Sequence, residues 1–168
     1  VLFSRVVDRR LRGEKVTLID LTTRETRTSR QADHVMLMQP QSDMAILNCI
    51  ANQLIQHGKY DKAFVQKHCQ FRGPGEPAGL MGEIITFEEY KEAVSEYTLE
   101  RTAEISGLSV EQLRLLGETF ARRDVKISSL WCMGVNQHTQ GTAVNNLIHA
   151  VHLLSGHWGR PGDGPQSL

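Results

Sequence analysis

Three short apolar runs are separated by longer segments in which apolar residues recur at helical spacing. The runs are KVTLIDL (15–21), HVMLM (34–38) and VKISSLWCM (125–133). They alternate only weakly between apolar and polar positions, which is typical of strands that are covered on both faces. We therefore expect three buried strands.

The longest helical pattern begins at Asp43 and keeps its apolar residues on one face until Gly58. A second apolar stripe runs from Val144 to Leu154 and stops at Gly156, a residue type that commonly ends helices. Polar residues with capping potential mark three further helix starts: Asp61, ahead of a helix ending near Cys69, and the capping-box pairs Thr86/Glu89 and Ser109/Gln112.

Strands that alternate with helices predict an α/β fold with a Rossmann-like, largely parallel sheet, flanking helices and a helix-rich insertion. We expect segments 1–60 and 124–168 to form the sheet and 61–123 to form a helical excursion. The segment RGPGEPAGLMG (72–82) is rich in glycine and proline, and GRPGDGPQSL (159–168) closes the chain, so both are predicted to be loops. Both chain ends read as cuts through a longer, multidomain protein.

The composition excludes some classes of partner. Lysine and arginine together number 19, as do aspartate and glutamate, so no net field favours nucleic acid. No window approaches the roughly 18 apolar residues of a membrane span. The cysteines, Cys49, Cys69 and Cys132, have neither metal-site spacing nor the density of a disulfide framework, which predicts unpaired thiols. We expect neither a nucleic-acid partner nor membrane insertion.

In α/β sheets, ligands gather beyond the carboxyl ends of strands, and polar residues follow all three predicted strands. DLTTRETRTSR (20–30) offers threonine hydroxyls and Arg24 and Arg27 for phosphate, although three arginines could equally share one solvated helical face. QPQSD (39–43) follows the second strand. The carboxylate of Asp43 could accept two hydrogen bonds from guanine, or simply cap a helix.

The third strand leads into WCMGVNQHTQG (131–141), which has amide, hydroxyl and imidazole groups between two glycines and no formal charge. Such a run suits close approach to a heterocyclic or polyanionic cofactor, and a polar loop in water is the simpler alternative. The other six histidines lie scattered and are expected to be structural. Signatures of serine hydrolases, P-loops and dinucleotide folds are absent. The residues alone therefore indicate a nucleotide-like cofactor site without visible catalytic machinery.

Four segments of the sequence resemble the catalytic subunits of periplasmic nitrate reductases, in the molybdopterin oxidoreductase superfamily. They are VLFSRVVDRR, IDLTTRETRTSRQADHVMLMQPQSDMAILNCIANQLIQ, FEEYKEAVSEYTLERTAEISGLSVEQL and WCMGVNQHTQGTAVNNLIHAVHLLSGHWGRPGDGPQSL. The last segment is the most specific. Compared with similar sequences, Cys132 replaces a usual threonine, Gln140 a usual arginine and Gln166 a more common aromatic residue.

The resemblance implies a molybdenum ion held by two pterin guanine dinucleotides, one 4Fe–4S cluster, and reduction of nitrate to nitrite by oxygen-atom transfer. It also implies a di-haem cytochrome c as electron donor and a periplasmic location. By position in the family, the cofactor-contacting residues are Thr22, Thr23, Arg24, Glu25 and Thr26 in one loop, Gln41, Ser42 and Asp43 in a guanine-recognising turn, and Met133 and Gln137 deeper in the site.

The cysteines that hold the cluster and the molybdenum belong to a part of the family absent from this chain. We therefore expect no metal ligand and no catalytic residue among these 168 residues, and no nitrate reduction by this segment alone. Two alternatives stay open. One is another molybdopterin oxidoreductase, such as a formate dehydrogenase, and the other is a non-enzymatic α/β module that binds a nucleotide.

Overall fold

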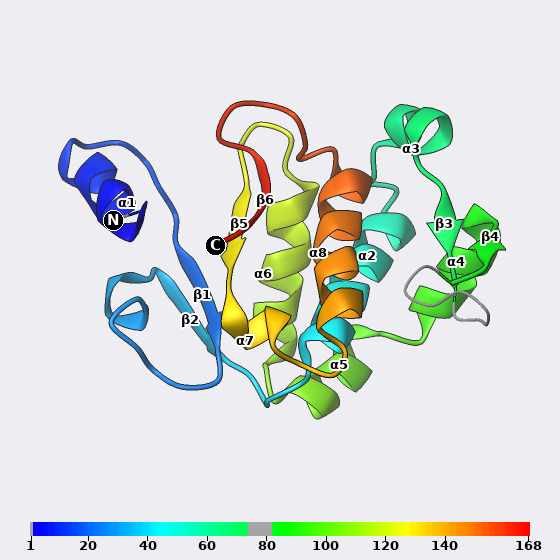
Figure 1. The fold of residues 1–168 in the computed structure, drawn as a ribbon, viewed down its shortest axis with the longest axis horizontal. Helices are drawn as coiled ribbons and strands as arrows, with labels where there is room; N and C mark the ends of the chain where they lie inside the picture. Colours follow the sequence, from blue (N-terminus) through cyan, green and yellow to red (C-terminus); the bar gives the residue numbers. More distant parts are fainter. Residues whose placement is uncertain (1, 74–81) are drawn as a thin grey trace. The chain divides into compact units, whose positions relative to one another are not determined.

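A computed structural model describes residues 2–73 and 82–168. The contacts within the chain divide it into two compact units, residues 1–40 and 41–168, each of which is described by itself. Both units contain parallel strand pairs, and the second is rich in helices (Figure 1). The predicted α/β class is confirmed.

The first unit is a parallel strand pair with one helix ahead of it. Its elements are α1 (Leu2–Leu11), β1 (Ile19–Thr22), the 3-10 helix η1 (Ser29–Gln31) and β2 (His34–Leu37). Ile19 lies opposite His34, and Thr22 lies opposite Leu37. Both strands were predicted, but β1 begins four residues later than the apolar run, and α1 was not predicted.

The side chain of Arg10 ties the helix of this unit to its strands. Its guanidinium donates to the backbone carbonyls of Val16 (2.8 Å) and Gln31 (2.6 Å) and forms an ion pair with Asp33. The Asp33 carboxylate also accepts a hydrogen bond from the Leu18 N–H (2.7 Å). A single arginine therefore holds the segments on both sides of β1.

The second unit combines helices with two further strand pairs. β3 and β4 pair antiparallel, and β5 and β6 pair parallel, with Ser128 opposite Gly164. Its elements in chain order are α2 (Asp43–Gln56), α3 (Lys62–His68), β3 (Phe71–Arg72), β4 (Ile84–Ile85), α4 (Phe87–Ser95), α5 (Leu99–Ser106), α6 (Val110–Ala121), β5 (Ser128–Trp131), α7 (Met133–Asn136), α8 (Gly141–Ser155) and β6 (Gly164–Ser167).

Helix α2 is the centre of this unit. It packs against α4, α5, α6 and α8, and Figure 1 shows it partly behind α8. Ile46 and Leu54 of α2 are almost fully buried, as are Leu113 of α6 and Val151 of α8. Gln53 adds a polar tie, because its amide donates to the Leu113 carbonyl (3.0 Å). The segment between the second and third predicted strands therefore supplies much of the core.

The predicted helix ends are confirmed. Asp61 accepts from the Phe64 N–H at 3.1 Å, and the capping boxes at Thr86 and Ser109 are both formed. Gly156 ends α8 in the left-handed conformation, with φ of 74°. Local capping chemistry therefore sets where these helices begin and end.

Two sequence-based expectations were wrong. The third strand stops at Trp131, and the polar run that follows forms the short helix α7 in place of a loop. The chain end was predicted to be a loop, but Gly164–Ser167 forms β6, because its backbone completes a parallel pair with β5. The predicted glycine-rich loop at 72–82 lies largely outside the described residues, and the domain boundaries predicted at residues 60 and 124 stay a prediction.

Candidate functional site

Two of the five predicted residues at the end of β1 and in the loop after it form hydrogen bonds within that loop. The Thr22 hydroxyl donates to the Arg24 carbonyl at 3.0 Å. The Thr26 hydroxyl accepts from the Thr28 N–H (3.1 Å), which starts η1, and the Ser29 hydroxyl in turn donates to Asp20 (2.6 Å). These bonds resemble those of serine and threonine turns and fix the path of the loop.

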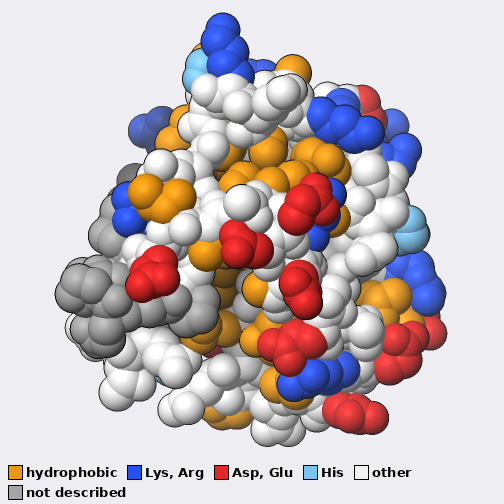
Figure 2. Space-filling model, turned by 90° about the vertical axis from the view of Figure 1, so that its right-hand side faces the viewer, with side chains coloured by type: hydrophobic (Ala, Val, Ile, Leu, Met, Phe, Trp, Pro, Cys, Tyr) orange, Lys and Arg blue, Asp and Glu red, His pale blue; other side chains and the backbone are white. Residues whose placement is uncertain are grey.

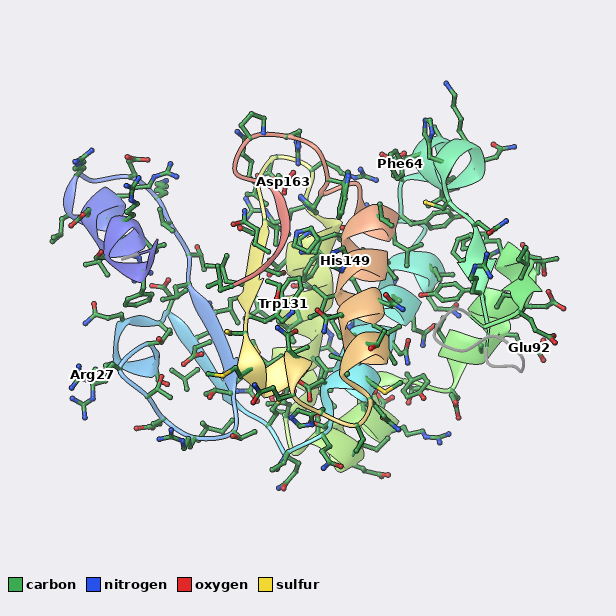
Figure 3. The ribbon with its side chains drawn as sticks, in the orientation of Figure 1. Arg27, Phe64, Glu92, Trp131, His149 and Asp163 are labelled. Carbon is green, nitrogen blue, oxygen red and sulfur yellow. The ribbon has the colours of Figure 1, made fainter. Side chains whose placement is uncertain are left out.

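The three residues between them face outward. Thr23, Arg24 and Glu25 are exposed, and within the described part of the chain neither Arg24 nor Glu25 has an ion-pair partner. Arg27 is also exposed and points away from the ribbon (Figure 3). The loop therefore presents hydroxyl and guanidinium groups without internal charge partners, as a phosphate-binding loop would.

The turn ahead of α2 has an unusual backbone. Gln41 is in the left-handed region with φ of 68°, a conformation that a non-glycine residue adopts at a cost. Ser42 is almost fully buried, and Asp43 stands half-buried in the first turn of α2. Among the described residues, the Asp43 carboxylate has no hydrogen-bond or ion-pair partner. It is therefore free to accept from a ligand, beside a helix end that favours negative charge.

The last two predicted residues lie in helix α7 and directly after it. Met133 is 60% exposed, which is high for a large apolar side chain, and Gln137 follows the helix and is also exposed. A side-chain carbon added at Gly134 would meet nothing within 4 Å, so the surface is open there. One at Gly141 would lie 2.6 Å from the Asn136 carbonyl oxygen. We expected both glycines to admit a ligand, but Gly141 is needed for the close approach of α7 and α8.

The second unit brings the Asp43 turn and α7 to one place. Trp131, Val144 and Ile148 form a buried cluster, and the residues packed against it include Met44 of α2 and Val135 of α7. Met44 follows Asp43 directly, and Val135 lies midway between Met133 and Gln137. The two segments that carry Gln41 to Asp43 and Met133 and Gln137 therefore both contact one apolar cluster, through Met44 and Val135, while Thr22 to Thr26 lie in the other unit.

The sequence did not indicate an amide network on this anchor. The Trp131 indole N–H donates to the side-chain oxygens of Asn136 (3.1 Å) and Asn145 (2.8 Å). Figure 3 shows Trp131 and His149 together between β5 and α8, and their rings meet edge to face at 5.7 Å. The only available signal was the abundance of neutral polar residues, since the spacing from 131 to 136 to 145 matches no motif.

A second polar network joins β5, α8 and the segment ahead of β6. His152 contacts the Ser129 hydroxyl through Nε2 (2.7 Å) and the His157 carbonyl through Nδ1 (2.9 Å). Asp163 accepts from the Ile127 N–H (2.8 Å) and from Arg160 (2.7 Å), and lies 3.2 Å from Nδ1 of His157. Both histidines are fully buried, which agrees with the structural role expected for them.

These contacts determine protonation. Burial lowers the pKa of His152 to about 4. The neutral ring then donates from Nδ1 to the carbonyl and accepts at Nε2 from the serine hydroxyl. Burial raises the pKa of Asp163, but the hydrogen bonds from Ile127 and Arg160 outweigh it, so its pKa lies below the ordinary value.

A surface hollow of about 560 Å³ lies away from the predicted site. It is formed by α3 with β3, β4 and the start of α4, and aromatic and apolar side chains line it, including Tyr60, Val65, Phe71, Ile85 and Phe87. Figure 2 faces this end of the unit and shows hydrophobic side chains at the surface with acidic side chains beside them. No predicted site residue lines this hollow.

The described residues offer no metal centre. Across 2–73 and 82–168, no group of three or more His, Cys, Asp or Glu side chains could hold a metal ion. Cys49 is buried, Cys69 half-buried and Cys132 exposed, and all three are free thiols. In the same ranges no helix is long and apolar enough to cross a membrane.

Comparison with known proteins assigns the family. The sequence profile of the family described as molybdopterin oxidoreductase matches residues 2–168. The chain belongs to the molybdopterin oxidoreductase family. A similar solved structure is acetylene hydratase from Pelobacter acetylenicus, with a TM-score of 0.74 and 24% identity over 96% of this chain. At this identity the likeness shows a shared fold, and the chain spans only 20% of the length of that protein.

The site residues of this molybdopterin oxidoreductase chain fit the organic part of the family's cofactor. Asp43 provides an unpartnered acceptor, Met133 an exposed apolar surface, and Gly134, the next residue after Met133, open space. In the first unit, taken by itself, Arg24 provides an exposed cation. Molybdenum itself would need ligands from elsewhere in a longer protein or from the pterin.

Proposed function

We propose that this chain is the part of a molybdenum-dependent nitrate reductase that binds one guanine dinucleotide arm of the cofactor. The observation that carries the proposal is the unpartnered Asp43 carboxylate in the first turn of α2, joined to α7 through the Trp131 cluster. The nitrate assignment rests on the sequence resemblance, above all on WCMGVNQHTQG and the helix after it.

Each predicted residue suits a different part of the cofactor because of its side-chain chemistry. Guanine presents two neighbouring N–H donors, and a carboxylate can accept from both, which gives Asp43 the recognition of the base. Arg24 and the exposed Thr23 suit phosphate oxygens. Met133 offers an apolar contact and Gln137 an amide that both donates and accepts. The bound cofactor supplies the oxygen-atom and electron transfer, while these residues hold it in place.

The proposal includes features that reside outside this chain. A 4Fe–4S cluster and the protein ligand of molybdenum would come from other parts of the full-length protein. A di-haem cytochrome c would deliver electrons, and the enzyme would work in the periplasm. Each of these follows from the resemblance to periplasmic nitrate reductases.

The test is a cofactor and activity assay on the full-length protein that contains this chain. We expect molybdenum, iron and acid-released guanine nucleotide in the purified protein, with two guanines per molybdenum, and dye-linked reduction of nitrate. Turnover of formate in place of nitrate would change the substrate assignment and keep the cofactor site. Absence of both molybdenum and guanine nucleotide would refute the proposal.

Replacing Asp43 tests the guanine contact directly. In Asp43→Asn the amide accepts with only one oxygen and points a donor at guanine, so one guanine donor loses its partner. An unpaired buried donor costs on the order of 1–3 kcal/mol, and we expect lower guanine content in the purified variant. Glu88→Gln is the matched control, because Glu88 is also an acid in a first helical turn and forms only a surface pair with Lys91 (2.7 Å). Equal guanine content in both variants would contradict the assignment.

A further inference from the structure

The amides of Asn136 and Asn145 share the indole N–H of Trp131, and together these residues are called the amide clamp. We propose that the amide clamp sets the orientation of α7, so that Asn136 and Asn145 are positioning residues for the cofactor contacts of Met133 and Gln137. The inference rests on the proposed function and adds residues that the resemblance did not point to.

The clamp connects four elements through directed hydrogen bonds. Trp131 of β5 donates to the oxygens of both amides. The Asn145 amide nitrogen, in α8, donates to the Asn136 oxygen (3.0 Å) and to the Gly141 carbonyl (2.7 Å). The Asn136 nitrogen donates to the Ser167 hydroxyl of β6 (3.0 Å). Because an indole nitrogen can only donate, both amides must present oxygen to it, which fixes their orientation.

Helix α7 needs such support because it has only four residues. An isolated helix of that length is unstable in water. Val135 anchors one face of α7 to the apolar cluster, and Asn136 anchors the neighbouring position to β5, β6 and α8. Met133 and Gln137 flank these two anchors, so their directions follow from the clamp.

Asn136 and Asn145 differ in which side-chain atom makes two hydrogen bonds, and replacing each by aspartate distinguishes them. Asn136 uses its oxygen as a double acceptor, so Asn136→Asp keeps both of those bonds, and the Ser167 hydroxyl can reverse and donate to the new carboxylate. Asn145 uses its nitrogen as a double donor toward the Asn136 oxygen and the Gly141 carbonyl. Asn145→Asp places a carboxylate against two acceptors, which repel it. Both variants add one negative charge at nearly the same place.

The experiment compares these variants in the full-length protein that contains this chain. The readouts are hydrogen exchange of peptides covering 132–141 and acid-released guanine nucleotide per polypeptide. We expect Asn145→Asp to speed exchange roughly tenfold, the effect of losing about one hydrogen bond, and to lower guanine content. Asn136→Leu is expected to do the same, and Asn136→Asp is expected to restore both readouts toward the wild-type values.

Trp131→Phe is a milder variant if an asparagine substitution prevents folding. It keeps an aromatic ring beside His149 and removes the shared N–H together with the second ring of the buried indole, so faster exchange and a partial loss of guanine are expected.

Wild-type exchange and wild-type guanine content in Asn145→Asp would overturn the inference while leaving the proposed function intact. Loss of guanine with unchanged exchange would overturn the positioning role in favour of a direct contact. A wild-type protein without guanine would instead refute the proposed function.

Discussion

Two glycines of the polar run after β5 have different tasks at the scale of single residues. Gly141 lies where α7 and α8 approach each other, and a side-chain carbon there would lie 2.6 Å from the Asn136 carbonyl oxygen and 3.0 Å from that of Val135. Gly134 faces open space. Of these two glycines, only Gly141 is therefore required by the packing of the described residues.

Gly141→Ala should lower the free energy of unfolding of the chain by roughly 1–3 kcal/mol, because the backbone of α7 must move to admit the methyl group. Gly134→Ala is the matched control. It should leave stability unchanged or raise it by up to about 1 kcal/mol, since alanine is the better helix former. Urea unfolding of both variants gives the comparison, and equal midpoints would show that α7 and α8 can separate at no cost.

At the scale of elements, the helix starts depend on capping side chains that the sequence makes visible. Ser109 accepts from the Gln112 N–H (3.2 Å), and the Gln112 side chain accepts from the Ser109 N–H (3.0 Å). The helix that begins here, α6, packs directly on α2 and contributes the fully buried Leu113. Fraying of its first turn would therefore loosen the core.

Ser109→Ala removes the cap and should reduce the free energy of unfolding by about 1 kcal/mol. Ser109→Asp should keep most of the stability, because aspartate also caps well. Ser128→Ala serves as the control, since Ser128 is exposed on β5 and its hydroxyl has no partner among the described residues. A Ser109→Ala midpoint no lower than that of Ser128→Ala would rule out a role for the cap in stability.

At the scale of the whole molecule, the buried His152 makes the stability of the second unit depend on pH. The unfolded chain binds a proton on this histidine below pH 6.5, whereas burial holds the folded pKa at about 4. The contribution of neutral His152 to the free energy of unfolding is therefore fully present above pH 6.5 and is lost as the pH falls toward 4. The contribution of this group is roughly 3 kcal/mol at most.

His152→Gln should flatten this dependence between pH 6.5 and 4, because glutamine does not titrate there. The measurement is the urea midpoint at several pH values, followed by tryptophan fluorescence. His57→Gln is the control, since His57 is exposed at the end of α2. If His152→Gln retains the wild-type slope, another group is responsible for the acid sensitivity.

Several elements whose structure depends on residues close together in the sequence were predicted correctly. Helix α2, the caps at Asp61, Thr86 and Ser109 and the stop at Gly156 were all predicted, because each depends on contacts within one or two turns. In contrast, β6 was missed because its sequence, GPQS, has no apolar pattern and its pairing with β5 defines it.

The same distinction holds for the candidate site. The Asp43 turn and the 133–137 segment could be proposed from the sequence, because both are local polar runs at strand ends. The amide clamp could not be, because Asn136 and Asn145 meet only after α7 folds back on α8. Nor could His152 and Asp163 be linked in advance, since residues from three elements meet in their network.

The left-handed backbone of Gln41 carries a cost in folding free energy that a glycine at this position would avoid. A left-handed conformation costs a residue with a side chain about 1–2 kcal/mol, and glycine adopts it without that cost. For folding alone, glycine would be the better residue at this turn. In the proposed site, a contact between the Gln41 side chain and the ligand would have to contribute more than about 1 kcal/mol to offset this backbone cost.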